Sequence, residues 1–114
     1  MDSSRKAAIQ SFKERKIARG IFAMRCRATG GVWVDSAMDL RAAENRAWSE
    51  LRMAGAHLEK NIAAEFREHG QENFHFEILE TLADDVAALS LHDVLKERKL
   101  YWKERLNART LSPV

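Results

Sequence analysis

The sequence predicts an α/β domain of the α+β type, in which a small three-stranded sheet opens with an N-terminal β-hairpin and is flanked by helices. Apolar side chains alternate with other residues over 22–28 and 74–79, which is typical of strands. Thr-Gly-Gly at 29–31 predicts a tight turn, since glycine adopts positive φ without steric cost. Apolar residues recur at steps of three and four in three further segments, 40–51, 58–66 and 91–106. The expected order is helix, strand, strand, helix, helix, strand, helix.

The chain is expected to open with a basic helix over residues 1–19, which starts after Ser3 or Ser4 and stops before Gly20. The remaining elements are assigned to one domain, residues 20–110. A chain of 114 residues suits one hydrophobic core and leaves little room for a second.

The predicted hairpin joins a strand over 20–28 to a second strand over 32–34. Phe22, Met24 and Cys26 alternate along the first strand and are expected to share its core side. The other side would carry Ala23, Arg25 and Arg27. Cys26 has no second cysteine for a disulfide or a zinc site, and its place in the alternation favours packing over a nucleophilic role.

The later elements have recognisable start and stop signals. Ser36 or Asp39 can cap the helix over 40–51, and Gly55 is expected to end it. The next helix is expected from about His57 to His69, before Gly70. The last two elements are a third strand over 74–79 and a final helix that starts at a capping box formed by Ser90 and Asp93.

Composition narrows the class of protein. The chain is 46% hydrophobic and 32% charged, as expected of a globular domain. No apolar run approaches the roughly 20 residues that span a bilayer, so no membrane partner is expected. The N-terminus lacks the apolar core and cleavage site of an export signal, which favours a cytoplasmic location.

Charge is distributed unevenly along the chain. Residues 1–53 carry 11 Lys/Arg against 6 Asp/Glu, residues 54–95 carry 2 against 9, and residues 96–114 carry 6 against 2. Basic ends around an acidic middle could present one positive face to a polyanion. Solvated helix faces of mixed sign explain the same counts equally well.

Several landmarks together resemble the GIY-YIG nuclease family. Gly-Ile-Phe at 20–22 stands where the family has Gly-Ile-Tyr, and Trp-Val-Asp at 33–35 stands where it has Tyr-Ile/Val-Gly. Phe-Glu-Ile-Leu-Glu at 76–80 is similar to the family's third strand, and Tyr-Trp at 101–102 to its last helix. The resemblance covers roughly residues 18–110 and implies a β-β-α-α-β-α core.

The resemblance also implies a chemistry. In the family, a glutamate on the last helix holds a divalent cation, two motif tyrosines position or activate water, and an arginine on the first helix offsets charge on the phosphate. A hard cation such as Mg²⁺ or Mn²⁺ requires carboxylate oxygen, and hydrolysis requires a positioned nucleophile.

Most of these family positions are substituted. Phe22 and Trp33 replace the two tyrosines, Ala43 replaces the arginine, and Lys99 replaces the metal-binding glutamate. Asp35 replaces the motif glycine, which adds a charge. Only His57 matches a residue that some family members place near the metal. The sequence therefore indicates no metal ligand and no cofactor, unless the chain cleaves with Mg²⁺ or Mn²⁺.

Each position also has a structural interpretation. Phe22 and Trp33 could pack in the core, Lys99 could extend to water beside an apolar stripe, and His57 could simply begin a helix.

Three functions stay open at this point. The first is binding of the phosphate backbone of nucleic acid, DNA in preference to RNA, without hydrolysis. Its predicted contacts are Arg25, Arg27, Arg41, Arg46, Lys99 and the basic N-terminal segment. The second is a working endonuclease in which Arg46, with Glu97 or Glu44, replaces the missing groups. The third is a protein-interaction module that docks a protein partner through the acidic middle segment.

Overall fold

A computed structural model describes residues 17–112, apart from 54–55 and 84. Most of the basic helix expected over residues 1–19 lies outside the described residues, and 17–19 have no regular secondary structure. None of the described helices is both long enough and apolar enough to cross a membrane.

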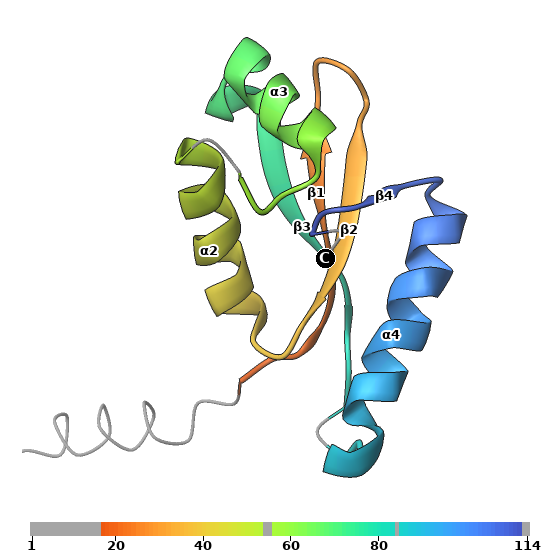
Figure 1. Cartoon of the computed structure of the whole chain (residues 1–114). Coiled ribbons are helices and arrows are strands. Elements are labelled where there is room, and N and C mark those ends of the chain that lie inside the picture. The colour runs from red at the N-terminus through yellow and green to blue at the C-terminus, as the bar shows by residue number, and fades with distance from the viewer. Residues whose placement is uncertain (1–16, 54–55, 84, 113–114) are drawn as a thin grey trace, which may run out of the picture.

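The centre of the fold is a four-stranded mixed sheet, shown in Figure 1. Its order is β3–β1–β2–β4, from β1 (Gly20–Cys26), β2 (Val32–Ala37), β3 (Phe74–Thr81) and β4 (Arg109–Thr110). β1 pairs antiparallel with both β2 and β3, which confirms the predicted hairpin and third strand. The prediction of only three strands was wrong, because β4 pairs parallel with the edge of β2. Two residues are too few for an alternation to indicate a strand in the sequence.

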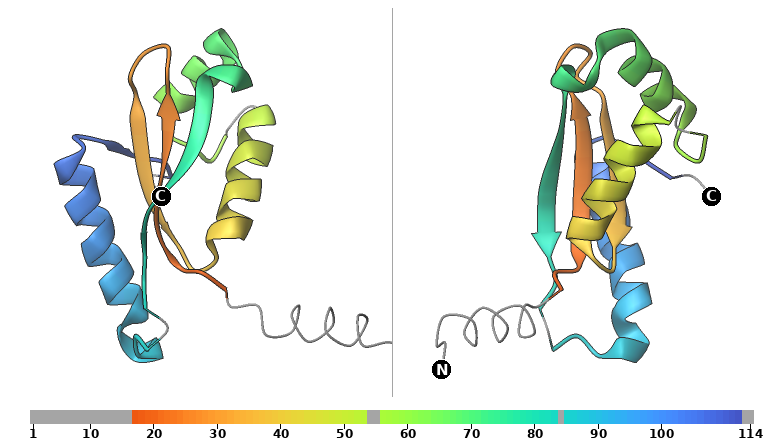
Figure 2. Two further views of the ribbon diagram at one scale, coloured as in Figure 1. Left: turned by 180° about the vertical axis from the view of Figure 1, so that it is seen from behind. Right: turned by 90° about the vertical axis from the view of Figure 1, so that its left-hand side faces the viewer.

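Helices cover both faces of the sheet. α2 (Leu40–Arg52) and α3 (Lys60–His69) lie on one side, and α4 (Ala88–Arg105) lies on the other, as Figure 2 shows. A short 3₁₀ turn, Gln71–Asn73, leads from α3 into β3. The helices thus follow the predicted order, with a sheet between two helical layers.

Local capping explains where the helices begin. The Asp39 side chain accepts the N–H groups of Arg41 and Ala42, both at 3.1 Å, so Asp39 is the cap of α2. α3 begins later than His57, because the Glu59 side chain accepts the first free N–H groups there. The predicted capping box at Ser90 was wrong, since α4 begins at Ala88 and Ser90 lies within its first turn.

Burial on both faces of the sheet divides the core into two clusters. Phe22, Met24 and Cys26 pack with α2 and α3, which confirms their shared side and the packing role of Cys26. On the opposite face Ile21, Ala23 and Val34 pack against Leu91 and Leu95 of α4. Ala23 is fully buried because α4 covers that face as well.

Gly20 occupies a position that no larger residue fits. A Cβ atom there would lie 1.9 Å from the backbone oxygen of Glu80 on β3. The pairing of β1 with β3 shifts just after this point, between Ile21 and Phe22, so that Leu79 is an extra residue in β3. The close approach of the two backbones explains the glycine of the Gly-Ile-Phe motif in physical terms.

Candidate functional site

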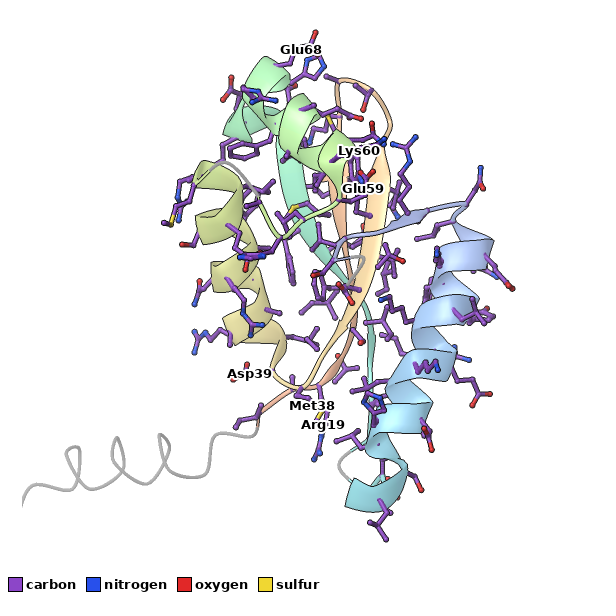
Figure 3. The ribbon with its side chains drawn as sticks, viewed as in Figure 1. Arg19, Met38, Asp39, Glu59, Lys60 and Glu68 are labelled. Atoms are coloured by element: carbon purple, nitrogen blue, oxygen red, sulfur yellow. The ribbon has the colours of Figure 1, made fainter. Side chains whose placement is uncertain are left out.

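Trp33 is an interior residue, not an exposed one. Its ring is fully buried and lies near Phe74, with ring centres 6.3 Å apart. Its Nε1–H donates to Glu59 Oε1 at 2.8 Å, which ties β2 to the start of α3. Figure 3 shows Glu59 and Lys60 beside β2 at this point. The indole is therefore committed to a structural hydrogen bond.

Glu59 collects several hydrogen bonds at the start of α3. Besides Trp33 it accepts the N–H groups of Asn61 at 2.9 Å and Ile62 at 3.1 Å, and the Asn61 side-chain amide donates at 2.7 Å. Burial acts to raise the pKa of Glu59, but the hydrogen bond from Trp33 and those from Ile62 and Asn61 outweigh it, so this pKa lies below its usual 4.5. Glu59 is thus held as a carboxylate.

Phe22 and Ala43 also serve packing. Phe22 is buried and stacks on Phe76, with ring centres 4.9 Å apart. Ala43 packs on the same cluster from α2. Neither side chain carries a group that can transfer a proton or bind a phosphate, so these two positions supply only the wall of the site.

An ion pair joins α4 to β2. Lys99 Nζ on α4 lies 3.1 Å from Asp35 Oδ1 on β2, and these side chains are only 25% and 16% exposed. Asp35 Oδ1 also accepts the N–H of Ser36 at 2.9 Å, while Oδ2 accepts the N–H of Ser112 at 3.1 Å. The two charges therefore neutralise each other.

The residues after β4 close one side of this region. Leu111 is 3% exposed; its N–H donates to the Val34 oxygen at 3.1 Å, and its oxygen accepts the N–H of Glu59 at 2.8 Å. Ser112 follows and donates its hydroxyl to the backbone oxygen of His57 at 3.4 Å. The segment thus joins β2 to the start of α3.

A cleft of about 370 Å³ lies between β2 and α2. Its polar walls are Asp35, Asp39, Arg46 and Glu50, and Phe22 and Ala43 form part of its apolar wall. Figure 3 shows Met38 and Asp39 at its lower end, where β2 leads into α2. Among the charged residues that the sequence analysis named as family-site or nucleic-acid-binding positions, only Asp35 and Arg46 line this cleft.

The donor groups of the region do not suit a divalent cation. The described residues contain no group of three or more His, Cys, Asp or Glu side chains that could hold a metal ion. The one carboxylate nearest to Lys99 already accepts an ammonium group and two backbone N–H groups. Like unit charges about 4 Å apart repel by about 4 kcal/mol near a protein surface, and a divalent ion doubles that cost.

The side chain of His57 forms no hydrogen bond or ion pair with these groups. Its side chain is exposed in the turn before α3, and it does not line the cleft that holds Asp35 and Arg46. Only its backbone oxygen takes part, as the acceptor for Ser112.

The five cations predicted to contact nucleic acid do not form one surface. Arg25 binds Glu77 on β3 at 3.0 Å, and Arg27 is exposed near the hairpin turn. Arg41 and Arg46 are exposed on α2, but five residues separate them, which places them about 140° apart around the helix. Lys99 lies on the opposite side of the sheet from α2.

The structure brings Lys99 together with two cations that the sequence analysis did not single out. Lys99 and Lys103 on α4 and Arg109 on β4 line a second cleft, of about 530 Å³. The spacing of four residues places both lysines on one stripe of α4 and could have indicated the pair. No sequence pattern links Arg109 to them, because β4 brings it there through pairing with β2.

Solved structures share this fold. The catalytic domain of homing endonuclease I-TevI aligns with a TM-score of 0.65 and 26% identity, over 78% of this chain and 88% of that one. A glutamate-to-alanine mutant of the catalytic domain of intron endonuclease I-TevI aligns with a TM-score of 0.69 and 23% identity, over 86% of this chain and 95% of that one. No protein-family model and no curated protein matches the sequence.

Proposed function

Since this chain has the GIY-YIG homing endonuclease fold, we propose that it binds the phosphate backbone of nucleic acid, DNA in preference to RNA, without cleaving it. The homing endonuclease that it resembles supports nucleic acid as the ligand. The substituted family positions support the loss of cleavage, because the groups that would hold a cation and activate water are absent there.

One observation carries the proposal. Lys99, which the resemblance aligns with the family's metal-binding glutamate, is ion-paired with Asp35, which the resemblance aligns with the motif glycine. Under this alignment, the ammonium group of Lys99 lies where the divalent cation of the family would have to bind. Phosphate can still be attracted electrostatically by such a group, but a hydroxide held by a metal is not available for attack.

A cleavage assay tests the half of the proposal that excludes cleavage. Supercoiled plasmid is incubated with the full chain in Mg²⁺ or Mn²⁺, beside an active GIY-YIG nuclease as a positive control. We expect no nicked product from this chain. Nicking that disappears in Arg46→Ala or Glu97→Ala, with folding unchanged, would overturn this half and favour the endonuclease with relocated groups.

A binding assay tests the other half, the affinity for nucleic acid. Fluorescence anisotropy of labelled DNA and RNA is measured in EDTA, beginning at 50 mM salt. We expect affinity without a divalent ion that weakens steadily as salt rises, since phosphate contacts release counterions. No affinity for either polymer at 50 mM salt would end the proposal and leave the protein-interaction module as the function to test.

A further inference from the structure

We infer that the backbone phosphates bind on the α4 side of the sheet, in the cleft between α4 and β4, with Lys103 and Arg109 as principal contacts. The inference rests on the proposed function and deepens it by placing the ligand. It differs from the sequence prediction, which placed most contacts on β1 and α2. We call this cleft the α4–β4 groove; it is lined by Glu59, Lys99, Lys103, Ala108, Arg109, Thr110 and Ser112.

The groove carries the donors that a phosphate requires. Lys99, Lys103 and Arg109 supply three cationic groups, and Thr110 adds a hydroxyl. Charge-assisted hydrogen bonds from lysine and arginine are the strongest contacts that a protein offers to phosphate oxygens. Of the residues that the structure describes, none forms an ion pair with Lys103 or Arg109.

Two carboxylates near the groove, those of Glu59 and Asp35, already have partners. Glu59 accepts hydrogen bonds from Trp33, Asn61 and Ile62. Asp35 accepts Lys99, which leaves that ammonium group partly neutralised. The positive potential of the groove therefore comes mainly from Lys103 and Arg109, one from each wall.

The groove continues along α4. Lys99, Lys103 and Thr110 also line the adjoining cleft, of about 480 Å³, which includes Lys96. From Lys96 to Lys103 the helix rises by about 10 Å, at about 1.5 Å per residue. Phosphates along one strand of a duplex are spaced by about 3.4 Å along its axis, so this run spans about three phosphates. Asp93 and Glu97 also line the adjoining cleft, which makes Lys96 the weaker end of the run.

Three charge-matched double variants of the full chain locate the contact. Lys103→Gln/Arg109→Gln removes both walls of the groove. Arg41→Gln/Arg46→Gln removes the cations that the sequence predicted on α2. Arg52→Gln/Arg67→Gln removes two exposed arginines of α2 and α3 that do not line the α4–β4 groove. Circular dichroism and thermal unfolding establish that each variant is folded before its affinity is measured.

Affinity for a 20-nucleotide DNA, single-stranded and duplex, is measured by anisotropy in EDTA between 50 and 200 mM salt. We expect the groove variant to lose at least about tenfold at 50 mM salt, because two phosphate contacts are removed. Its slope of log affinity against log salt should become shallower by about 1.4 for single strands and about 1.8 for duplex. The Arg52/Arg67 variant should keep the wild-type slope.

The outcomes separate this inference from the proposed function. If wild-type protein binds and the groove variant binds equally well, the α4–β4 groove is not the site, and a loss in the Arg41/Arg46 variant would move it to α2. The proposed function would then stand. If wild-type protein shows no affinity at 50 mM salt, both are overturned.

Discussion

At the scale of the residue, Asp35 and Lys99 explain each other. A carboxylate that is mostly buried without a partner is costly, and so is a mostly buried ammonium group. Facing each other at 3.1 Å, they form a charge-assisted pair that two backbone N–H groups complete. Under the alignment on which the proposed function rests, the negative charge has moved from the last helix to the second strand, and a lysine stands opposite.

This exchange predicts that a single substitution will make the stability of the protein depend on a metal ion. In Lys99→Glu, Asp35 loses its partner and faces a second carboxylate. We therefore expect the free energy of unfolding in EDTA to be about 1–3 kcal/mol lower than that of wild type. Mg²⁺ at ten times its dissociation constant should return about 1.4 kcal/mol, because two carboxylates can share a hard cation. Urea unfolding with and without Mg²⁺ measures both effects.

Lys99→Gln is the matched control. It loses the ion pair but adds no carboxylate, so its stability should fall without responding to Mg²⁺. Wild-type protein should not respond either. The account of the site would be wrong if Lys99→Glu were as stable as wild type in EDTA, or if Mg²⁺ left its unfolding midpoint unchanged.

At the scale of the element, the start of α3 and the strand β4 depend on each other. Glu59 caps α3 with its side chain, and its own N–H donates to Leu111 just beyond β4. Leu111 in turn donates to Val34 on β2. Three segments far apart in the chain therefore meet through short backbone contacts. This arrangement fixes one wall of the α4–β4 groove.

The cap gives the fold a predictable response to acid. The pKa of Glu59 lies below its usual 4.5 in the folded protein, so the hydrogen bonds to its carboxylate stabilise the fold fully above about pH 4.5. That stabilisation is lost as pH falls through the lowered value. We expect the unfolding temperature of wild type to fall more steeply below pH 4.5 than that of Glu59→Gln, which has no such carboxylate.

Thermal unfolding followed by circular dichroism from pH 7 to pH 3 tests this. Glu104→Gln, which removes an exposed carboxyl on α4, serves as the control and should keep the wild-type slope. Equal slopes for wild type and Glu59→Gln would show that the cap does not contribute to acid sensitivity.

At the scale of the whole molecule, one sheet serves two apolar layers. Ile62 belongs to the cluster under α2 and α3, and Leu95 belongs to the cluster under α4. Both clusters include residues of β1, so neither layer can lose its packing without affecting the strand at the centre of the sheet.

We therefore expect cooperative unfolding of both layers. Ile62→Ala and Leu95→Ala should each lower the free energy of unfolding by about 2–5 kcal/mol, since each empties a buried site. In each variant, circular dichroism and tryptophan fluorescence should give the same urea midpoint. Separate midpoints in Leu95→Ala would show instead that α4 unfolds independently of the rest.

Much of the fold could be predicted because it depends on neighbours in the sequence. The hairpin followed from the Gly-Gly turn and the alternation over 22–28, and Asp39 was one of two predicted caps for α2. The errors arose where another part of the chain decides. Ala23 was assigned to the outer side because nothing in the strand shows that α4 covers it. Ser90 is of a residue type that often caps helices, but α4 already begins at Ala88.

The sequence by itself determined the resemblance and the packing roles of Phe22 and Cys26, and it predicted that the groups needed for hydrolysis are substituted. Only the tertiary structure decided that Asp35 and Lys99 are partners, that a fourth strand exists, and that Arg109 joins Lys103 across a groove. The reason is range: periodicity and caps act over a few residues, whereas Asp35 and Ser112 meet across 77 positions of the chain. Contacts of that length are set by how the sheet and helices pack, which no local pattern records.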